Sequence, residues 1–225
     1  MVDEELAHCF ERDGRVWLRN AISAADLARF DRVAETSSKP GKRLQISGGL
    51  AELLSEGSSL TAAIGGLEPQ AKPVRAVAFN KTEEANWGLP WHQDRIIAVA
   101  EPHDLPGFGT WTQKSGAWHC EPPAEVLERM LFVRVHLDDG DPANGAMRIA
   151  VGSHRAGLVP YAEADRTAAG YPVEDCAAVR GDVLVLKMLT LHASNPAAEP
   201  SARRVLRIDF AAFDLPPPLG WAAAP

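Results

Sequence analysis

Residues 74–95 read VRAVAFNKTEEANWGLPWHQDR and hold both the start of the predicted β core and its most informative polar residues. The run Val74–Asn80 predicts a strand, and a second strand is predicted over His92–Ala100. Residues two apart on a strand point to the same face, so His92 and Asp94 are expected to reach one point together. An imidazole and a carboxylate form a donor pair suited to Fe(II) or Mn(II). This His-x-Asp (HxD) pattern alone is a weak signal, because such triplets also arise by chance.

The chain after Pro73 consists of short apolar or alternating runs bounded by Gly, Pro, Asp and Asn. Five further strands are predicted at Met130–Leu137, Met147–Val151, Val173–Val179, Asp182–Leu186 and Val205–Phe213. Seven or more short strands without regular helices between them predict an antiparallel sandwich or barrel. Residues 101–123 form a long excursion rich in Gly, Pro and Trp, which we interpret as a binding loop or lid.

The first seventy residues have helical periodicity. Helices are predicted at Asp3–Arg12, Ala24–Ala34 and Leu50–Leu54, with Ser23 as the N-cap of the second. At 225 residues the chain is long enough for one domain with a full core. We therefore expect a single domain over 1–225, with a helical preface at 1–72, a β core at 73–213 and a loose Pro- and Ala-rich tail at 214–225.

Composition is that of a globular protein, with 46% apolar and 24% charged residues. A net charge of -7 argues against nucleic acid or an anionic membrane as a partner, although a local site can still attract a small anion. Neither a signal peptide nor an apolar run of membrane-spanning length is evident. The three cysteines lack a CxxC motif, so a disulfide framework or thiolate zinc site is not expected, and a cytoplasmic location is the simpler interpretation.

A third ligand candidate follows the apolar stretch Val183–Leu191. His192 lies there, and Arg203 comes eleven residues later at the start of the last predicted strand. A lone histidine in this setting is usually a packed core residue. Two histidines and one carboxylate, however, leave three positions on iron open. A 2-oxoacid can occupy two and dioxygen the third, and the distal carboxylate of the oxoacid then requires a buried cation such as Arg203, with Ser194 as a hydroxyl donor.

Three segments carry a resemblance to a known family. They are residues 74–95, LFVRVHLDDGDPANGAMRIAVGSHR (131–155) and LTLHASNPAAEPSARRVLRIDFA (189–211). In these segments and their spacing the sequence resembles the phytanoyl-CoA dioxygenase family of Fe(II)- and 2-oxoglutarate-dependent oxygenases. With their spacing they cover about two thirds of the chain, whereas the helical preface resembles the family only loosely.

The resemblance implies a double-stranded β-helix (jelly-roll, cupin-like) core with flanking N-terminal helices. It implies that His92, Asp94 and His192 are the metal ligands, that Arg203 anchors 2-oxoglutarate and that Ser194 assists it. The implied reaction uses dioxygen to hydroxylate an unactivated carbon of a small molecule, releasing succinate and CO2. Strand alternation puts Arg207 on the same face as Arg203 and leaves it open as the anchor, although the interval from His192 favours Arg203. The substrate and the oligomeric state are not predictable from the sequence.

Two residues on the strand Leu131–Asp138 are also candidates. Arg134 and His136 share one of its faces. If that face looks into the barrel, we expect them to contact the oxoacid or the substrate, and the alternative is a solvated outer face.

Other residues are weaker candidates for contact with the substrate. Asn80 and Lys81 end the strand before the HxD segment, and the resemblance suggests a pocket-edge position for them. Trp91 and Trp111 flank or occupy the loops near the metal, where an aromatic side chain is more often a packing anchor than a contact for the substrate. His154, after the predicted Asn144-Gly145 turn, is interpreted as structural.

Three rival interpretations remain at this level. A metal enzyme on the same barrel that does not use an oxoacid would keep the triad without needing Arg203. A non-catalytic metal- or ligand-binding module would keep the fold, but the triad and the arginine would then be coincidental. A zinc hydrolase is disfavoured, because such sites more often use three histidines, or two histidines and a glutamate, with a nearby general base.

Overall fold

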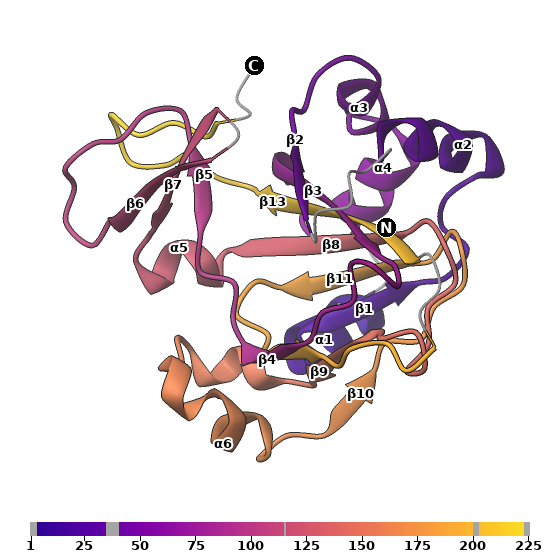
Figure 1. Ribbon diagram of the computed structural model, residues 1–225. Helices are drawn as coiled ribbons and strands as arrows, with labels where there is room; N and C mark the ends of the chain where they lie inside the picture. The colour runs from indigo at the N-terminus through magenta and orange to yellow at the C-terminus, as the bar shows by residue number, and fades with distance from the viewer. Residues whose placement is uncertain (1–3, 35–40, 115, 200–202, 223–225) are drawn as a thin grey trace.

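The computed structural model describes residues 4–34, 41–114, 116–199 and 203–222, and antiparallel strand pairs organise it into three sheets (Figure 1). The largest has the order β1-β11-β8-β13-β3-β2, the second β10-β9-β12-β4 and the third β5-β7-β6. The strands are β1 Arg15–Leu18, β2 Lys42–Leu44, β3 Lys72–Lys81, β4 Leu89–His92, β5 Ile97–Val99, β6 Gly109–Lys114, β7 Ala117–Glu121, β8 Met130–His136, β9 Met147–Ala150, β10 Val173–Asp175, β11 Val183–Lys187, β12 His192–Ser194 and β13 Arg203–Ala211.

Strand alternation gives the large sheet two different faces. On β13, Leu206, Ile208 and Phe210 join the core beneath the helices, so the alternate residues Arg203 and Arg207 point to the other face. The inner side chains of β8 and β11 pack instead with those of β9 in a second core between the two larger sheets. Two antiparallel sheets facing each other across a core, with polar residues on one inner strand, form the expected jelly-roll, or double-stranded β-helix.

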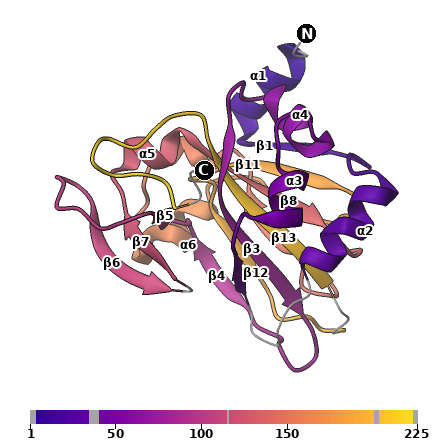
Figure 2. The same cartoon turned by 90° about the horizontal axis from the view of Figure 1, so that it is seen from above.

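The N-terminal helices cover the outer face of the large sheet, as the view from above shows for α2, α3 and α4 (Figure 2). Ser23 caps α2 by accepting a hydrogen bond from the backbone N–H of Asp26 at 3.1 Å, as predicted. The helices are α1 Glu4–Asp13, α2 Ala24–Val33, α3 Gly48–Leu53, α4 Ser59–Gly65, α5 Ala124–Glu128 and α6 Ala164–Ala168, with 3-10 turns η1 Ser153–Ala156 and η2 Tyr161–Glu163. None of the helices in these ranges is long and apolar enough to cross a membrane.

The N-terminal region is not purely helical, which corrects the sequence prediction. It also supplies β1 and β2, the two edge strands of the large sheet, through pairing with β11 and β3. Both strands are only three or four residues long, and their partners lie far along the chain, so no local pattern marks them. Asp3, the predicted first residue of the first helix, lies outside the described residues.

The strand predicted over His92–Ala100 is also wrong as a single element. β4 ends at His92, β5 begins at Ile97, and the link between them has no strand structure. By contrast, the strand predicted over Asp182–Leu186 is present as β11. β11 ends at Lys187, and His192 opens β12 in the opposite sheet.

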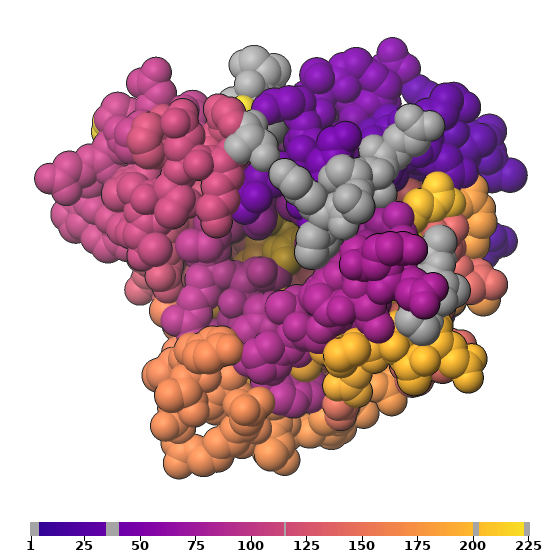
Figure 3. Space-filling model, in the orientation of Figure 1, coloured from indigo at the N-terminus to yellow at the C-terminus, as the bar shows by residue number. Residues whose placement is uncertain are grey.

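The excursion at residues 101–123 and the C-terminal tail are both more ordered than predicted. Strands β6 and β7 lie within the excursion and form the third sheet with β5. The tail folds back so that Trp221 forms a bridge with Val99 and is only 7% exposed, while the last three residues fall outside the described part. The surface is hollowed between this β5–β7 unit and the β2 side of the molecule, with C-terminal residues in yellow at its floor (Figure 3).

Candidate metal centre

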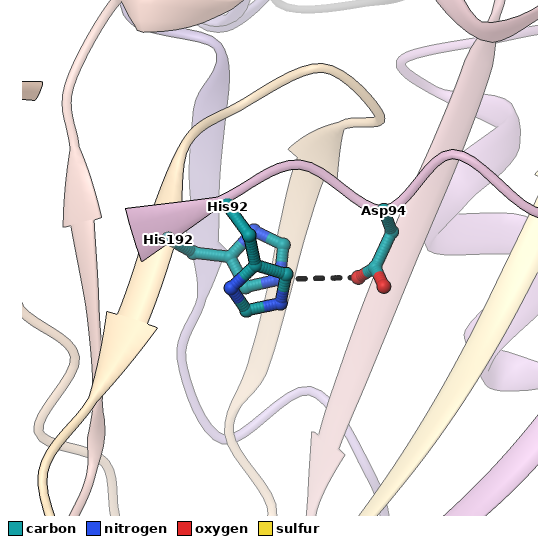
Figure 4. Close-up of side chains that lie close together, drawn as sticks. All are labelled: His92, Asp94 and His192. Atoms are coloured by element: carbon teal, nitrogen blue, oxygen red, sulfur yellow. Dashed lines mark ion pairs between the residues drawn. The ribbon is translucent and has the colours of Figure 1, made fainter. Parts of the chain in front are cut away.

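The side chains of His92, Asp94 and His192 converge on one point (Figure 4). One ligand atom from each lies within 4.8 Å of the other two. β4 and β12 are antiparallel neighbours in which His92 faces His192, and their ring centroids are 4.3 Å apart. Asp94 reaches the same point from the link after β4, so the three groups come together although His92 and Asp94 do not share a strand.

Gln93, the middle residue of the HxD segment, holds this link in place of strand pairing. Its side chain is 6% exposed and donates to the carbonyl oxygens of Gly157 at 2.8 Å and Leu189 at 2.7 Å. Its Oε1 accepts from the N–H of Val159 at 2.9 Å. Because Leu189 lies just before His192, one amide ties together the two segments that carry the converging side chains.

The ring nitrogens of the two histidines have fixed roles. Nδ1 of His92 lies 2.7 Å from the carbonyl oxygen of Pro90, and Nδ1 of His192 lies 2.9 Å from that of Thr190. A carbonyl can only accept, so both Nδ1 atoms carry a proton, and the Nε2 atoms are the ring nitrogens left to face a metal ion. Nε2 of His192 then faces Oδ2 of Asp94 at 3.0 Å. Two imidazole nitrogens and a carboxylate oxygen placed this closely form a donor set that fits a metal ion such as Fe(II).

Electrostatics keep the donors in the forms that bind a metal. Burial, followed by the neighbouring His192, lowers the pKa of His92 and favours its neutral ring. Burial alone would raise the pKa of Asp94, but the charge of Arg207 and the contacts with the two histidines outweigh it and hold that pKa well below its ordinary range.

The converging groups line a cavity of about 280 Å3 that also contains three guanidinium groups. These groups belong to Arg134, Arg203 and Arg207. Asp94 is the one carboxylate among the described residues that line the cavity. The remaining lining residues are Phe79, Trp87, Leu89, His92, Met147, His192, Ala193 and Ser194. A cavity with this surplus of positive charge favours an anionic ligand.

The three arginines differ in how they are paired. Arg207 binds Asp94 and also donates from Nε to Oδ1 of Asp209 at 2.6 Å. Arg203 is 6% exposed and donates only to the carbonyl oxygens of Asn144 at 3.3 Å and Gly145 at 3.0 Å, with no carboxylate partner in the described part of the chain. Burial lowers its pKa. Its charge is therefore available to a ligand, whereas that of Arg207 is already compensated.

Arg134 is the least satisfied of the three. Its Nε is buried and has no hydrogen-bond partner among the described residues. Burial, with repulsion from Arg203, lowers its pKa to about 9. A buried guanidinium N–H without an acceptor is unfavourable, so Arg134 and Arg203 together favour carboxylate groups in this cavity.

Arg134 and His136 lie on the inner face of β8, which was one of the two predicted alternatives. Of the two, only Arg134 lines the cavity. His136 lies behind it, 2% exposed, with Nδ1 bonded to the carbonyl oxygen of Asp182 at 3.2 Å and its ring against Trp17. Ser194 lines the cavity beside His192. His154 binds the carbonyl oxygen of Glu11 at 3.0 Å, outside the cavity, in agreement with a structural role.

None of the four weaker substrate candidates lines the cavity. Lys81 is 1% exposed and donates to the carbonyl oxygen of Asn195 at 2.6 Å, while the buried Oδ1 of Asn80 has no partner in the described chain. Trp91 packs against a small apolar cluster that includes Ala164 and Ala168 of α6. Trp111, on β6, packs against the second core, which lies between the two larger sheets. Trp87 lines the cavity instead, and its place there could not be predicted from the sequence because it depends on the path of the loop before β4.

Burial of His136 predicts acid-sensitive stability. Desolvation, with the charge of Arg134, lowers its pKa to about 3, whereas a histidine in the unfolded chain takes up its proton near pH 6.5. The unfolded state therefore binds more protons as the pH falls below 6.5, and this contribution to stability is lost toward pH 3. We expect it to remove about 2 kcal/mol between pH 7 and pH 5. Urea unfolding of His136→Gln should lose correspondingly less over this interval, and an equal loss in both proteins would contradict the assignment.

The family model described as Phytanoyl-CoA dioxygenase (PhyH) matches residues 10–205. No curated protein sequence matches significantly. Among solved structures, AviO1 from Streptomyces viridochromogenes Tue57 is 22% identical with a TM-score of 0.65, and the match covers 96% of this chain and 98% of that one.

Two further structures were determined with ligands. HygX from Streptomyces hygroscopicus, with nickel and 2-oxoglutarate bound, is 18% identical with a TM-score of 0.64 over 94% of this chain and 87% of its own. The epimerase SnoN from nogalamycin biosynthesis, in complex with Fe3+, alpha ketoglutarate and nogalamycin RO, is 14% identical with a TM-score of 0.66 over 92% and 82%. At these identities the likeness shows a shared fold.

Proposed function

The chain belongs to the phytanoyl-CoA dioxygenase family of Fe(II)- and 2-oxoglutarate-dependent oxygenases, and we propose that it hydroxylates an unactivated carbon of a small-molecule substrate with release of succinate and CO2. One observation carries this proposal. The three potential metal ligands share a cavity with two arginines that have no carboxylate partner among the described residues. A metal position beside two available cations meets the requirements of a chelating dicarboxylate.

His92, Asp94 and His192 would hold the iron through the two Nε2 atoms and one carboxylate oxygen. Three protein ligands leave positions for a bidentate oxoacid and for dioxygen. Iron bound there supplies the activation of dioxygen that couples oxidative decarboxylation of 2-oxoglutarate to oxidation of the substrate. The carbonyl oxygens of Pro90 and Thr190 keep both rings in the ligating tautomer.

Arg203 would bind the distal carboxylate of 2-oxoglutarate, with Arg134 as a second cation and Ser194 as a hydroxyl donor. A guanidinium matches a carboxylate with two parallel N–H donors, so this interaction orients the oxoacid as well as attracting it. Pairing with Asp94 and Asp209 makes Arg207 the weaker candidate for this role.

The apolar part of the cavity would exclude water and contact the substrate. Phe79, Trp87 and Met147 line it beside the potential ligands, and Leu89, 43% exposed, marks the side open to solvent. A dry, enclosed site protects the substrate oxidation from side reactions with water.

Isotope labelling tests the hydroxylation itself. The protein with Fe(II) and 2-oxoglutarate is screened against a small-molecule library for compounds that stimulate succinate formation, and the stimulating compound is then reacted under 18O2. We expect a product heavier by one oxygen atom that carries the 18O label. Stimulated succinate release with an isomerised or ring-closed product and no added oxygen would contradict hydroxylation while leaving the cofactor requirement intact.

A further inference from the structure

The buried pair Arg207 and Asp209 extends the candidate metal centre beyond its three ligands. We propose that Arg207, held by Asp209, is a positioning residue that fixes the carboxylate of Asp94 toward the metal and does not bind 2-oxoglutarate. This inference rests on the proposed metal site and assigns these two side chains a role in metal affinity.

The contacts of Arg207 hold its guanidinium on several sides. Nη1 donates to Oδ2 of Asp94, and Nε donates to Oδ1 of Asp209 at 2.6 Å. Nη2 lies 3.5 Å from the sulfur of Met188, and the guanidinium carbon lies 4.4 Å from the ring centroid of Phe132. The side chain is 6% exposed. A guanidinium confined in this way cannot turn toward a ligand in the cavity without breaking its ion pairs.

Asp209 is itself anchored, so the chain of charges continues. Nη1 of Arg75 donates to Oδ2 of Asp209 at 3.0 Å and to the carbonyl oxygen of Ile96 at 3.2 Å. Ile96 lies in the same link as Asp94, between β4 and β5. The ion pairs therefore begin and end on the same link. Arg207 contacts the side chain of Asp94, and Arg75 contacts the backbone two residues later.

Arg207 contacts the carboxylate oxygen of Asp94 that lies nearest to His192. Arg207 binds Oδ2, the atom that also lies 3.0 Å from Nε2 of His192. Because Asp94 follows the end of a strand, no ladder of backbone hydrogen bonds sets its direction, and its 28% exposed side chain borders an open cavity. Partners of this kind orient a ligating carboxylate, and their removal typically weakens metal binding by about 10- to 100-fold.

The strand offers a matched control. Arg204, the neighbour of Arg203 on the opposite face of β13, binds Asp138 at 2.7 Å and Asp31 at 2.9 Å, away from the cavity. Arg204→Lys therefore weakens an arginine–aspartate cluster on the same strand without touching the candidate centre.

The test measures metal affinity and coordination in Arg207→Lys, Asp209→Asn and Arg204→Lys. Each protein, shown to be folded by circular dichroism, is titrated anaerobically with Co(II), and the visible absorption of the bound Co(II) reports its coordination. 2-Oxoglutarate affinity is then measured on the metal-loaded proteins. We expect Arg207→Lys and Asp209→Asn to raise the Co(II) Kd by about 10- to 100-fold and to alter the spectrum. The Arg204→Lys protein should match the wild type.

Three outcomes separate this inference from the proposed function. Failure of the wild-type protein to bind Co(II) would overturn the metal site and the inference with it. Tight binding by the wild type, with unchanged affinity and spectrum in both variants, would overturn the positioning role alone. A loss of 2-oxoglutarate affinity in Arg207→Lys at unchanged Co(II) affinity would make Arg207 an oxoacid ligand and also overturn it.

Discussion

Replacing Arg203 with alanine is expected to raise the Kd for 2-oxoglutarate by about 10- to 100-fold, because a hydrogen bond to a charged group stabilises a complex by about 1.5–3 kcal/mol. The native guanidinium is buried in the cavity and donates only to two backbone carbonyl oxygens among its described contacts, so a carboxylate is the partner it lacks. Fe(II) affinity should remain within about twofold of wild type, since Arg203 makes no contact with the three potential ligands.

Calorimetric titration of the Fe(II)-loaded protein under anaerobic conditions measures this effect. Arg204→Ala is the control, because Arg204 lies on the outer face and binds Asp138 and Asp31. An unchanged Kd in Arg203→Ala together with a large increase in Arg134→Met would show that the oxoacid is anchored from β8 instead. An unchanged Kd in both would contradict the arginine assignment as a whole.

Replacing His92 or Asp94 with alanine is expected to have the largest effect, reducing both stoichiometric Fe(II) binding and 2-oxoglutarate-dependent succinate formation to background. Each variant loses one of three protein ligands, and Asp94→Ala also leaves Arg207 with one fewer counter-charge. Removing one partner of a buried ion pair destabilises a protein by about 3–5 kcal/mol, so folding is checked by thermal unfolding.

His103→Ala provides the control, since His103 lies in the 101–123 segment and is not one of the three converging groups. It should bind Fe(II) and form succinate as the wild type does. Succinate formation that survives in either His92→Ala or Asp94→Ala would refute the assignment of that residue as a ligand.

The prediction that His92, Asp94 and His192 lie together is confirmed, whereas the secondary structure predicted around them is partly wrong. The pattern suggested a shared strand for His92 and Asp94, but the strand ends at His92 and the buried amide of Gln93 fixes the link that follows. The requirement for two imidazoles and a carboxylate at one point does not depend on how the chain brings them there. A wrong local element therefore left the predicted group of residues intact.

The strands that were not predicted from the sequence depend on contacts between residues far apart in the chain or on pairing inside an apparent loop. β1 and β2 are strands because β11 and β3 offer them partners, and the third sheet depends on a hairpin inside an apparent loop. Alternation correctly put Arg203 and Arg207 on one face. Their different ion-pair partners follow from Asp209, two residues after Arg207, and from the position of Asp94 on another element.

We propose that one cavity binds Fe(II), through His92, Asp94 and His192, together with 2-oxoglutarate. Anaerobic titration of the metal-free protein with Fe(II) and then 2-oxoglutarate, followed by visible absorption, tests it most directly. A charge-transfer band should develop with one Fe(II) and one 2-oxoglutarate per chain and should be absent from Asp94→Ala. A wild-type protein that binds Fe(II) but develops no band on addition of 2-oxoglutarate would contradict the claim.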